Sequence, residues 1–212
     1  MEPMDFYTNW LAVIVVGFLA VASPGPDFAI TIRNSLVFSR RAGLFTALGI
    51  AMGLNFHIAY SLVGIGVLIS QSVWLFNVVK WIGAAYLIWV GIGAIRAGKT
   101  EFKTEEGVPG PQITAWGAWR VGFLTNLLNP KAPLFFLALY TQVIQPGTPL
   151  GAQSIYGFTI LAEALVWFSL VALLVSHQAV RGRLIAVSHW VERIFGVAFI
   201  ALGLKLALTR AN

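Results

Sequence analysis

Six long apolar segments follow one another along the chain, and short polar or basic stretches separate them. A helix that crosses a lipid bilayer needs about 20 consecutive, mostly apolar residues, and each segment reaches roughly that length. Every backbone amide inside lipid must find its partner within the protein, which a helix achieves by itself. The pattern therefore predicts an all-α integral membrane protein with six transmembrane helices. The predicted spans cover about residues 7–32, 43–70, 74–96, 117–142, 151–177 and 189–208.

The first and fourth of these segments are interrupted near their middle. The sequence SPGPD at 23–27 interrupts the first, and NPKAP at 129–133 interrupts the fourth. We expect the first span to break at 23–26 and the fourth at 129–133. Proline lacks a backbone N–H and clashes with the preceding turn, so it breaks a helix. Each break also carries a charged residue, Asp27 or Lys131, and a charge inside the bilayer costs at least about 2.5–3.5 kcal/mol. That cost favours a function for the two breaks over the alternative, a pair of proline kinks that only shape packing.

The two breaks occupy corresponding positions in two halves of three spans each. An odd number of spans per half makes the halves antiparallel, so the pattern predicts two inverted three-helix repeats with spans one and four broken by proline. The repeats cover about residues 1–96 and 117–212 of a single transmembrane domain, 1–212, and a cytoplasmic loop of about 97–116 joins them. Paired, interrupted hydrophobic segments point to the binding site of a transporter. We therefore expect the two breaks to lie close together inside the bundle.

The composition agrees with a membrane protein. Hydrophobic residues make up 58% of the chain and charged residues 10%, and the mean hydropathy is +0.81. Soluble domains carry about 25% charged residues, so this chain has too few charges to cover a water-exposed surface. The net charge of +6 does not indicate a nucleic-acid partner, because the basic residues of a membrane protein gather in its cytoplasmic loops.

The distribution of Lys and Arg predicts the orientation in the membrane. Nine basic residues fall in or near the loops on one side of the predicted bundle, and three lie near the other side. The positive-inside rule places the richer side in the cytoplasm and therefore both termini outside. The richer side holds Arg33, Arg40, Arg41, Arg96, Lys99, Lys103, Arg120, Arg181 and Arg183, and the other side holds Lys80, Lys205 and Arg210.

Several kinds of chemistry are excluded because the residues they need are missing. The chain has no cysteine, which excludes disulfides, thiolate zinc sites and thiol redox chemistry. It has no P-loop and no H-E-x-x-H or similar metal-ligand motif, so the sequence predicts neither an ATP-driven pump nor a metal or other cofactor. Asp27 and Glu163 could form an intramembrane acid pair for hydrolysis, but no nucleophile motif accompanies them. We therefore do not expect an enzyme.

Three stretches carry a resemblance to a known family: SPGPDFAITIRNSL…RRAGLFTALGIAMG in the first quarter, WIGAAYLIWVGIGAIRAG at 81–98, and LTNLLNPKAPLFFLAL at 124–139. In this order they resemble the LysE/RhtB family of amino-acid exporters, and LAEALVWF at 161–168 is most similar to its threonine exporters. The resemblance implies secondary active export of threonine, homoserine or related neutral amino acids across the bacterial inner membrane, by proton antiport. The partners are then a small amino acid, protons and the lipid bilayer, and both termini are periplasmic. Whether the chain forms a homodimer stays open.

Three charged residues within the predicted spans are the first candidates for a substrate site. An amino acid crosses as a zwitterion, so its ammonium needs an acceptor and its carboxylate a donor in surroundings of low dielectric. We predict that Lys131 helps to hold the carboxylate. Asp27 and Glu163 are predicted to carry the ammonium and the exchanged proton, because burial disfavours a charged carboxylate and a nearby ammonium favours it.

Each of these roles has a structural alternative. Lys131 could form an ion pair with an acid and take no part in substrate binding. Asp27 could cap the helix that follows the first break, where the helix dipole stabilises a negative charge. Glu163 could make a structural hydrogen bond or ion pair within the bundle.

Polar residues beside the breaks complete the candidate site. Asn126 and Asn129 flank the second break, where their amides either bind the zwitterion or cap the broken helix ends. Pro24, Gly25 and Pro26 form the first break, which exposes backbone N–H and C=O groups that a polar solute could use.

Three further residues are candidates for lining the cavity: Asn55, His57 and Trp167. His57 could relay protons, although a neutral, hydrogen-bonded histidine in the interior explains it as well. Trp167 shares a helix face with Glu163, four residues earlier, and packing alone accounts for it too.

Two other classes of function compete with the exporter. A channel-like facilitator for small polar solutes would share the broken helices but would lack coupling to protons, which cannot be read from the sequence. A membrane protein without transport function, such as an assembly protein, would not need matched breaks that carry buried charges. The matched breaks therefore favour a transporter over the second alternative.

Overall fold

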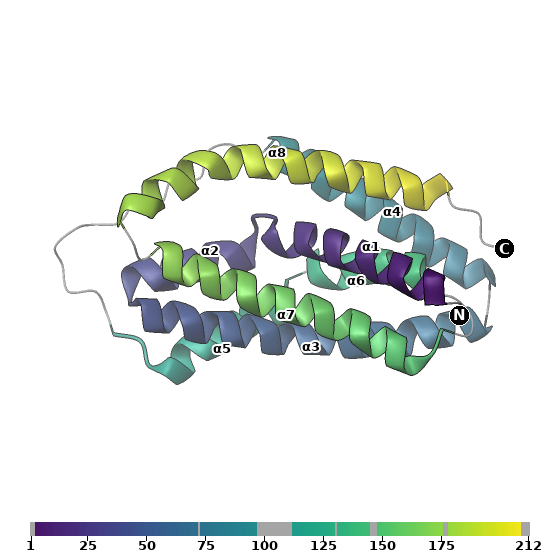
Figure 1. The fold of residues 1–212 in the computed structure, drawn as a ribbon, viewed down its shortest axis with the longest axis horizontal. Helices are drawn as coiled ribbons and strands as arrows, with labels where there is room; N and C mark the ends of the chain where they lie inside the picture. The colour runs from purple at the N-terminus through teal and green to yellow at the C-terminus, as the bar shows by residue number, and fades with distance from the viewer. Residues whose placement is uncertain are drawn as a thin grey trace.

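In the computed structural model, the part of the chain that is described forms eight helices, which cover the six predicted spans (Figure 1). The structure describes residues 3–71, 73–96, 112–129, 131–144, 148–175 and 178–208, and no strand lies among them. The helices are α1 (Pro3–Ala22), α2 (Pro26–Val37), α3 (Arg40–Gln71), α4 (Val73–Arg96), α5 (Ala115–Leu127), α6 (Lys131–Val143), α7 (Leu150–Val175) and α8 (Gln178–Leu208). The prediction of an all-α protein is confirmed.

The first predicted span forms two helices, as its prolines indicated. Helix α1 ends at Ala22 and α2 begins at Pro26, with a bend of 55° between them. Pro26 is the first residue of α2, a position where proline is favoured because the N–H it lacks would have no partner within the helix. The predicted break at 23–26 is therefore confirmed, with its last residue already helical.

The fourth predicted span also forms two helices, but its break lies earlier than predicted. Helix α5 ends at Leu127 and α6 begins at Lys131, so the predicted break at 129–133 is wrong in its second half. Ala132 and Pro133 belong to the first turn of α6, where proline is tolerated because the first N–H groups of a helix have no partner inside it.

Two polar stretches that the hydrophobic pattern placed between spans are largely helical. Helix α2 continues to Val37 and α3 begins at Arg40, and α8 begins at Gln178 and not near residue 189. Hydropathy detects only the part of a helix that suits lipid, whereas Arg and Gln are good helix formers in water. The helix ends therefore extend beyond the apolar segments.

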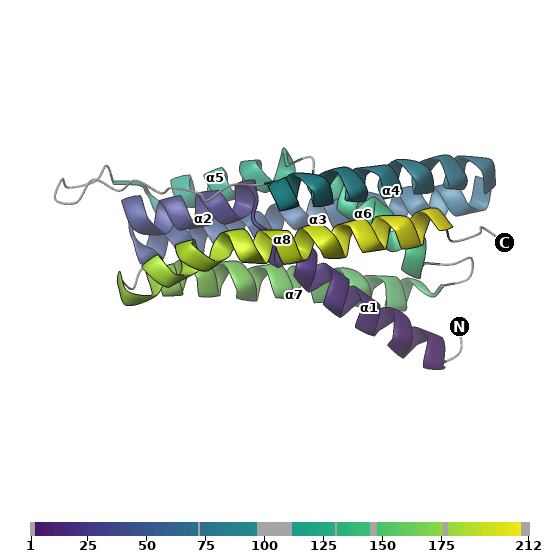
Figure 2. The same cartoon turned by 90° about the horizontal axis from the view of Figure 1, so that it is seen from above.

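The helices run along the long axis of the molecule, in two groups with three of the half-helices between them (Figures 1 and 2). Helix α4 packs on α8, and α3 packs on both α5 and α7. Helices α1, α2 and α6 lie between these groups, and α6 contacts both α3 and α4. The start of α1 and the end of α8 lie at the same end of the bundle.

Glycine allows the closest helix contacts. A Cβ added to Gly91 of α4 would lie 2.6 Å from the backbone oxygen of Gly196 on α8. A Cβ on Gly122 of α5 would overlap the backbone oxygen of Thr46 on α3. In lipid, apolar side chains gain little from being buried between helices, because the lipid tails are apolar as well. Helices there pack closely through small residues, which let their backbones approach each other.

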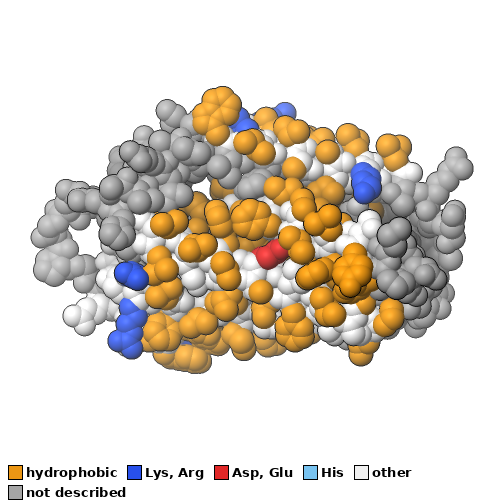
Figure 3. Space-filling view, viewed as in Figure 1, with side chains coloured by type: hydrophobic (Ala, Val, Ile, Leu, Met, Phe, Trp, Pro, Cys, Tyr) orange, Lys and Arg blue, Asp and Glu red, His pale blue; other side chains and the backbone are white. Residues whose placement is uncertain are grey.

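The outer surface is apolar, as contact with lipid requires. Figure 3 shows hydrophobic side chains over much of one face, with Lys and Arg near its margins. Within the described residues, Arg40–Leu62 and Leu150–Val175 are each long and apolar enough to cross a membrane, and α1 with α2 adds a third span if the bent pair counts as one. The helices thus agree with a membrane protein.

Candidate functional site

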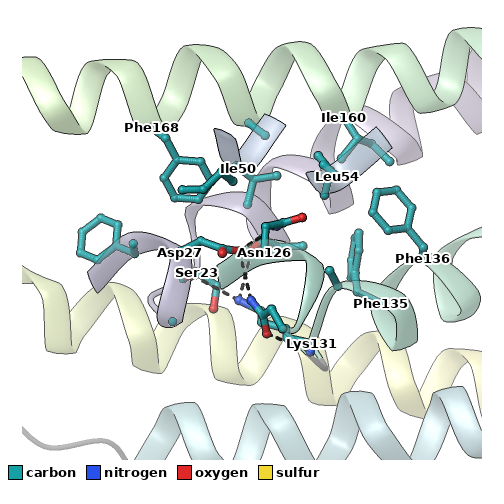
Figure 4. A pocket seen from close by; sticks show the side chains of 17 residues that line it. Ser23, Asp27, Ile50, Leu54, Asn126, Lys131, Phe135, Phe136, Ile160 and Phe168 are labelled. Atoms are coloured by element: carbon teal, nitrogen blue, oxygen red, sulfur yellow. Dashed lines mark hydrogen bonds between the residues drawn. The ribbon is translucent and has the colours of Figure 1, made fainter. Parts of the chain in front are cut away.

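The two helix breaks meet in the interior of the bundle, as the sequence predicted (Figure 4). The side-chain amides of Asn126 and Asn129, from the second break, each donate a hydrogen bond of 3.0 Å to Oδ2 of Asp27. In the other direction, Nζ of Lys131 donates to the backbone oxygens of Ala20 and Ser23 at 3.1 and 3.2 Å. The charged residue of each break is therefore held by groups of the other break.

Asp27 leaves one carboxylate oxygen unused. Its Oδ2 accepts both asparagine amides, while its Oδ1 is buried and has no hydrogen-bond partner among the described residues. Because an unsatisfied buried acceptor costs about 1–3 kcal/mol, such an atom is a candidate for receiving a donor from a ligand. The carboxylate lies in the first turn of α2, where the helix dipole favours it. It bonds across to Asn126 of α5 and to Asn129 between α5 and α6, and it does not serve as the cap that the sequence left open.

Asn129 also has the capping role that the sequence left open. Its Oδ1 accepts the backbone N–H of Lys131 at 3.0 Å, as an N-terminal cap of α6 does. Its Nδ2 binds Asp27 at the same time. One side chain therefore connects the start of α6 with the carboxylate on α2.

Lys131 fixes three helices relative to one another. It begins α6, and its Nζ binds the carbonyl of Ala20 in the last turn of α1 and that of Ser23 just after the helix, where carbonyls have no partner within the helix. The same Nζ lies 5.7 Å from the centre of the Phe199 ring on α8, within the range of a cation–π contact. The ammonium thus stabilises the negative end of the α1 dipole.

A small cavity of about 50 Å³ lies at the meeting point of the breaks. Its polar lining comes from Ser23, Gly25, Asp27, Asn126, Asn129 and Lys131. Its apolar lining comes from Ala20, Val21, Phe28, Ile50, Leu54, Ala132, Phe135, Phe136, Ile160, Ala164 and Phe168. This volume is enough for a few water molecules, so a bound amino acid requires neighbouring side chains or helices to move apart.

Six residues predicted for the site do not line this cavity: Pro24, Pro26, Asn55, His57, Glu163 and Trp167. For the two of them on α7, Glu163 and Trp167, the helix geometry gives the reason: Ile160, Ala164 and Phe168 are the α7 residues that line the cavity. A residue directly before one of these is turned by about 100° around the helix, which places Glu163 and Trp167 on another face.

Glu163 lies at the contact between α7 and α1. It is half-buried, and its Oε2 is buried without a hydrogen-bond partner among the described residues. A Cβ added to Gly17 of α1 would lie 2.7 Å from that oxygen, so the glycine makes room for the carboxyl group. Trp167 packs edge-on against Phe18, with ring centres 5.5 Å apart, which fits the packing role that the sequence left open.

His57 and Asn55 lie on α3, outside the cavity. Asn55 donates to the carbonyl of Ala51 within its own helix at 3.4 Å. The Nε2 atom of His57 lies 2.9 Å from the backbone oxygen of Asn126, and its Nδ1 lies 2.6 Å from the hydroxyl of Tyr60. Because a carbonyl oxygen can only accept, Nε2 carries a proton, and Nδ1 of a neutral ring then accepts from Tyr60. His57 therefore holds the end of α5 from which the Asn126 side chain reaches Asp27.

We predict that a glutamine can replace His57 but that a leucine cannot. His57→Gln keeps a donor near the position of Nε2, whereas His57→Leu leaves the carbonyl of Asn126 without it. One lost buried hydrogen bond costs about 1–3 kcal/mol, so His57→Leu should lower the free energy of unfolding by that amount. Because Asn126 is then less firmly placed beside Asp27, substrate binding measured by calorimetry should weaken as well. Asn55→Ala on the same helix is the matched control. If His57 relays protons, glutamine fails as badly as leucine in transport, and the positioning role is wrong.

Sequence reasoning missed Ser23 as a lining residue and the whole apolar wall of the cavity. Ser23 lies in the break that the sequence identified, so its position was a usable signal. The sequence could not show which residues of α3, α6 and α7 line the cavity, because apolar residues occupy every face of a helix that lies in lipid.

Comparisons with known proteins agree with the family resemblance that the three sequence stretches indicated. The family model for the LysE type translocator matches residues 18–210. The chain is 29% identical to the threonine efflux protein of Escherichia coli (strain K12) over 206 residues, which are 95% of this chain and 98% of the relative. It is 32% identical to the homoserine/homoserine lactone efflux protein of Salmonella typhimurium over 204 residues, 95% of this chain and 97% of the relative.

A membrane protein of Vibrio cholerae, named as uncharacterized, is 34% identical over 215 residues, 98% of this chain and 100% of the relative. No solved structure matches the chain. The match to the family model begins before the first break and continues through the last helix. The chain therefore belongs to the LysE type translocator family.

Proposed function

We propose that this protein exports small neutral amino acids, such as threonine, homoserine or related compounds, across the bacterial inner membrane in exchange for protons. Membership of a translocator family supports transport as the activity, not catalysis. The relatives named as threonine and homoserine efflux proteins support an amino-acid substrate. One observation carries the assignment of the site: Asp27 lines the cavity between two broken helices, and one of its carboxylate oxygens is buried with no hydrogen-bond partner among the described residues.

The substrate ammonium binds Oδ1 of Asp27 in this proposal. The two asparagine amides occupy Oδ2 and hold the carboxylate in place, so its other oxygen is available to a donor from the cavity. Charge-assisted hydrogen bonds of this kind are about twice as strong as neutral ones. The substrate carboxylate lies toward Lys131 and the N–H groups at the start of a half-helix, which favour an anion.

Proton exchange follows from the same contact. The ammonium of the substrate stabilises the ionised carboxylate, and its departure leaves that charge in surroundings of low dielectric, where a proton replaces it. Substrate and proton therefore exclude each other at Asp27, as antiport requires. Glu163 is the second proton site in this proposal, because its buried Oε2 also lacks a hydrogen-bond partner among the described residues.

The proposed architecture has six spans. If α1 with α2 and α5 with α6 each make one broken span, the eight described helices form two halves of three spans with inverted orientation. The excess of Lys and Arg in the loops on one side then places both termini in the periplasm.

The proposal is tested in proteoliposomes that start with equal concentrations of labelled threonine inside and outside. When the outer medium is acidified, proton entry should drive threonine out until the inside concentration falls below the outside one. An ionophore that removes the pH gradient should abolish this depletion. Exchange of label that never produces a concentration difference indicates a channel-like facilitator, and no movement of any neutral amino acid contradicts the proposed function.

A further inference from the structure

We infer that the protein prefers amino acids with an apolar, branched side chain, such as valine, leucine or isoleucine, over amino acids with a side-chain hydroxyl, such as threonine. This inference rests on the proposed function and specifies the substrate class of the same site. It follows from how the polar and apolar groups are distributed around the cavity.

The polar groups of the cavity all lie at the two breaks (Figure 4). Most of their hydrogen-bonding atoms already have partners. Nζ of Lys131 binds two carbonyls of the first break, and the amide of Asn129 binds both the start of α6 and Asp27. What remains is two buried acceptors, Oδ1 of Asp27 and Oδ1 of Asn126, which have no hydrogen-bond partner among the described residues and suit the ammonium that every amino acid has. The break therefore recognises the shared part of the substrate.

The rest of the cavity wall is apolar, and eight of its eleven residues come from three helices. Ile50 and Leu54 belong to α3, Phe135 and Phe136 to α6, and Ile160 and Phe168 to α7. All six side chains are at most 5% exposed, so this part of the wall is shielded from water. Among the described lining residues, no polar side chain stands on these three helices apart from Lys131 at the start of α6.

A substrate bound by its ammonium and carboxylate at the breaks directs its side chain toward this wall. A hydroxyl group there loses its hydrogen bonds to water and finds no protein donor or acceptor in exchange. A methyl group in the same place gains contact with the surrounding carbon atoms. Valine and threonine have nearly the same shape and differ by this single replacement, so they form the sharpest test pair.

The expected preference for valine over threonine has an upper bound. A pocket built for an apolar group rejects an isosteric hydroxyl compound by a factor of up to about 100. We therefore expect valine to compete about 10- to 100-fold more effectively than threonine for transport. Alanine, which is too short to reach the wall, should compete less well than valine.

The experiment measures how unlabelled valine, threonine and alanine inhibit counterflow of labelled leucine in proteoliposomes. Ala164→Ser places a hydroxyl in the α7 part of the wall with little change in volume, and it should reduce the ratio of valine to threonine. Ala152→Ser on the same helix is the matched control, because Ala152 is also buried but does not line the cavity.

The possible results distinguish a failure of the substrate preference from a failure of the proposed export function. If threonine competes as well as valine, the inference is overturned while the proposed function stands, because labelled leucine is still transported and both amino acids bind its site. The inference is also overturned if Ala164→Ser changes the ratio no more than Ala152→Ser does. If none of the neutral amino acids, including labelled leucine and threonine, moves at all, the proposed function itself fails. Should Ala164→Ser not fold, the valine-to-threonine ratio of the unchanged protein decides alone.

Discussion

Asp27→Asn is expected to abolish pH-driven export and to weaken substrate binding at least about 30-fold. Loss of one partner from a buried, hydrogen-bonded charge pair typically costs about 2–5 kcal/mol, which is a factor of about 30 to 5,000 in affinity. Asparagine has nearly the size of aspartate, so the cavity keeps its shape. The measurements are calorimetric titration of the purified protein and depletion of labelled substrate from proteoliposomes under a pH gradient.

The hydrogen bonds around Asp27 explain why an amide cannot take its place. Two amide donors, from Asn126 and Asn129, already point at Oδ2. The oxygen of a new asparagine has to remain there, because its NH₂ group cannot accept them. That NH₂ group then stands where Oδ1 of Asp27 was and presents donors to the substrate ammonium. Asp27→Asn therefore replaces an attraction by a repulsion and also removes the group that exchanges protons.

The matched control is the same chemical change in the other acid among the described side chains. Glu163→Gln should leave substrate binding nearly unchanged, because Glu163 does not line the cavity. A folded Asp27→Asn protein that exports substrate at the normal rate with the normal pH dependence would remove Asp27 from the mechanism. Glu163 would then be the remaining candidate for the proton site.

Lys131→Met is expected to lower substrate affinity by a similar factor, about 30-fold or more, and to lower stability as well. The loss of affinity follows if the ammonium of Lys131 faces the substrate carboxylate. The loss of stability follows because the carbonyls of Ala20 and Ser23 lose a charged donor, at a cost of about 1–3 kcal/mol. Calorimetry measures the first effect, and thermal unfolding in detergent measures the second.

A substrate analogue separates the two roles of Lys131. Valinamide lacks the carboxylate, so the unchanged protein should bind valine much more tightly than valinamide. In Lys131→Met this difference should largely vanish if the lysine recognises the carboxylate, because the coupling between two contacting groups is lost when either is removed. If Lys131→Met abolishes transport while valine binding stays unchanged, the lysine only caps α1 and the carboxylate role is wrong.

The sequence alone determined which segments form helices and which two of the predicted spans are broken. A bilayer imposes a minimum length of apolar residues on every spanning helix, and proline interrupts a helix wherever it stands in the interior. Both constraints act within a short stretch of chain, so SPGPD and NPKAP could be recognised without knowledge of the rest. The cost of a charge in lipid also identified Asp27 and Lys131 as candidates. The helix ends were less certain, because Arg40 and Gln178 begin helices outside the apolar segments.

The tertiary structure alone decided what these residues contact. Only the packed helices show that the asparagines of one break bind Oδ2 of Asp27 in the other and leave Oδ1 available. They also show that Ala164 faces the cavity while its neighbour Glu163 faces α1. A helix in a soluble protein reveals its inner face through an apolar stripe, but a helix that is apolar all round carries no such signal. Which face of α7 looks inward, and hence which side chains meet the substrate, is set by long-range packing between segments far apart in the chain.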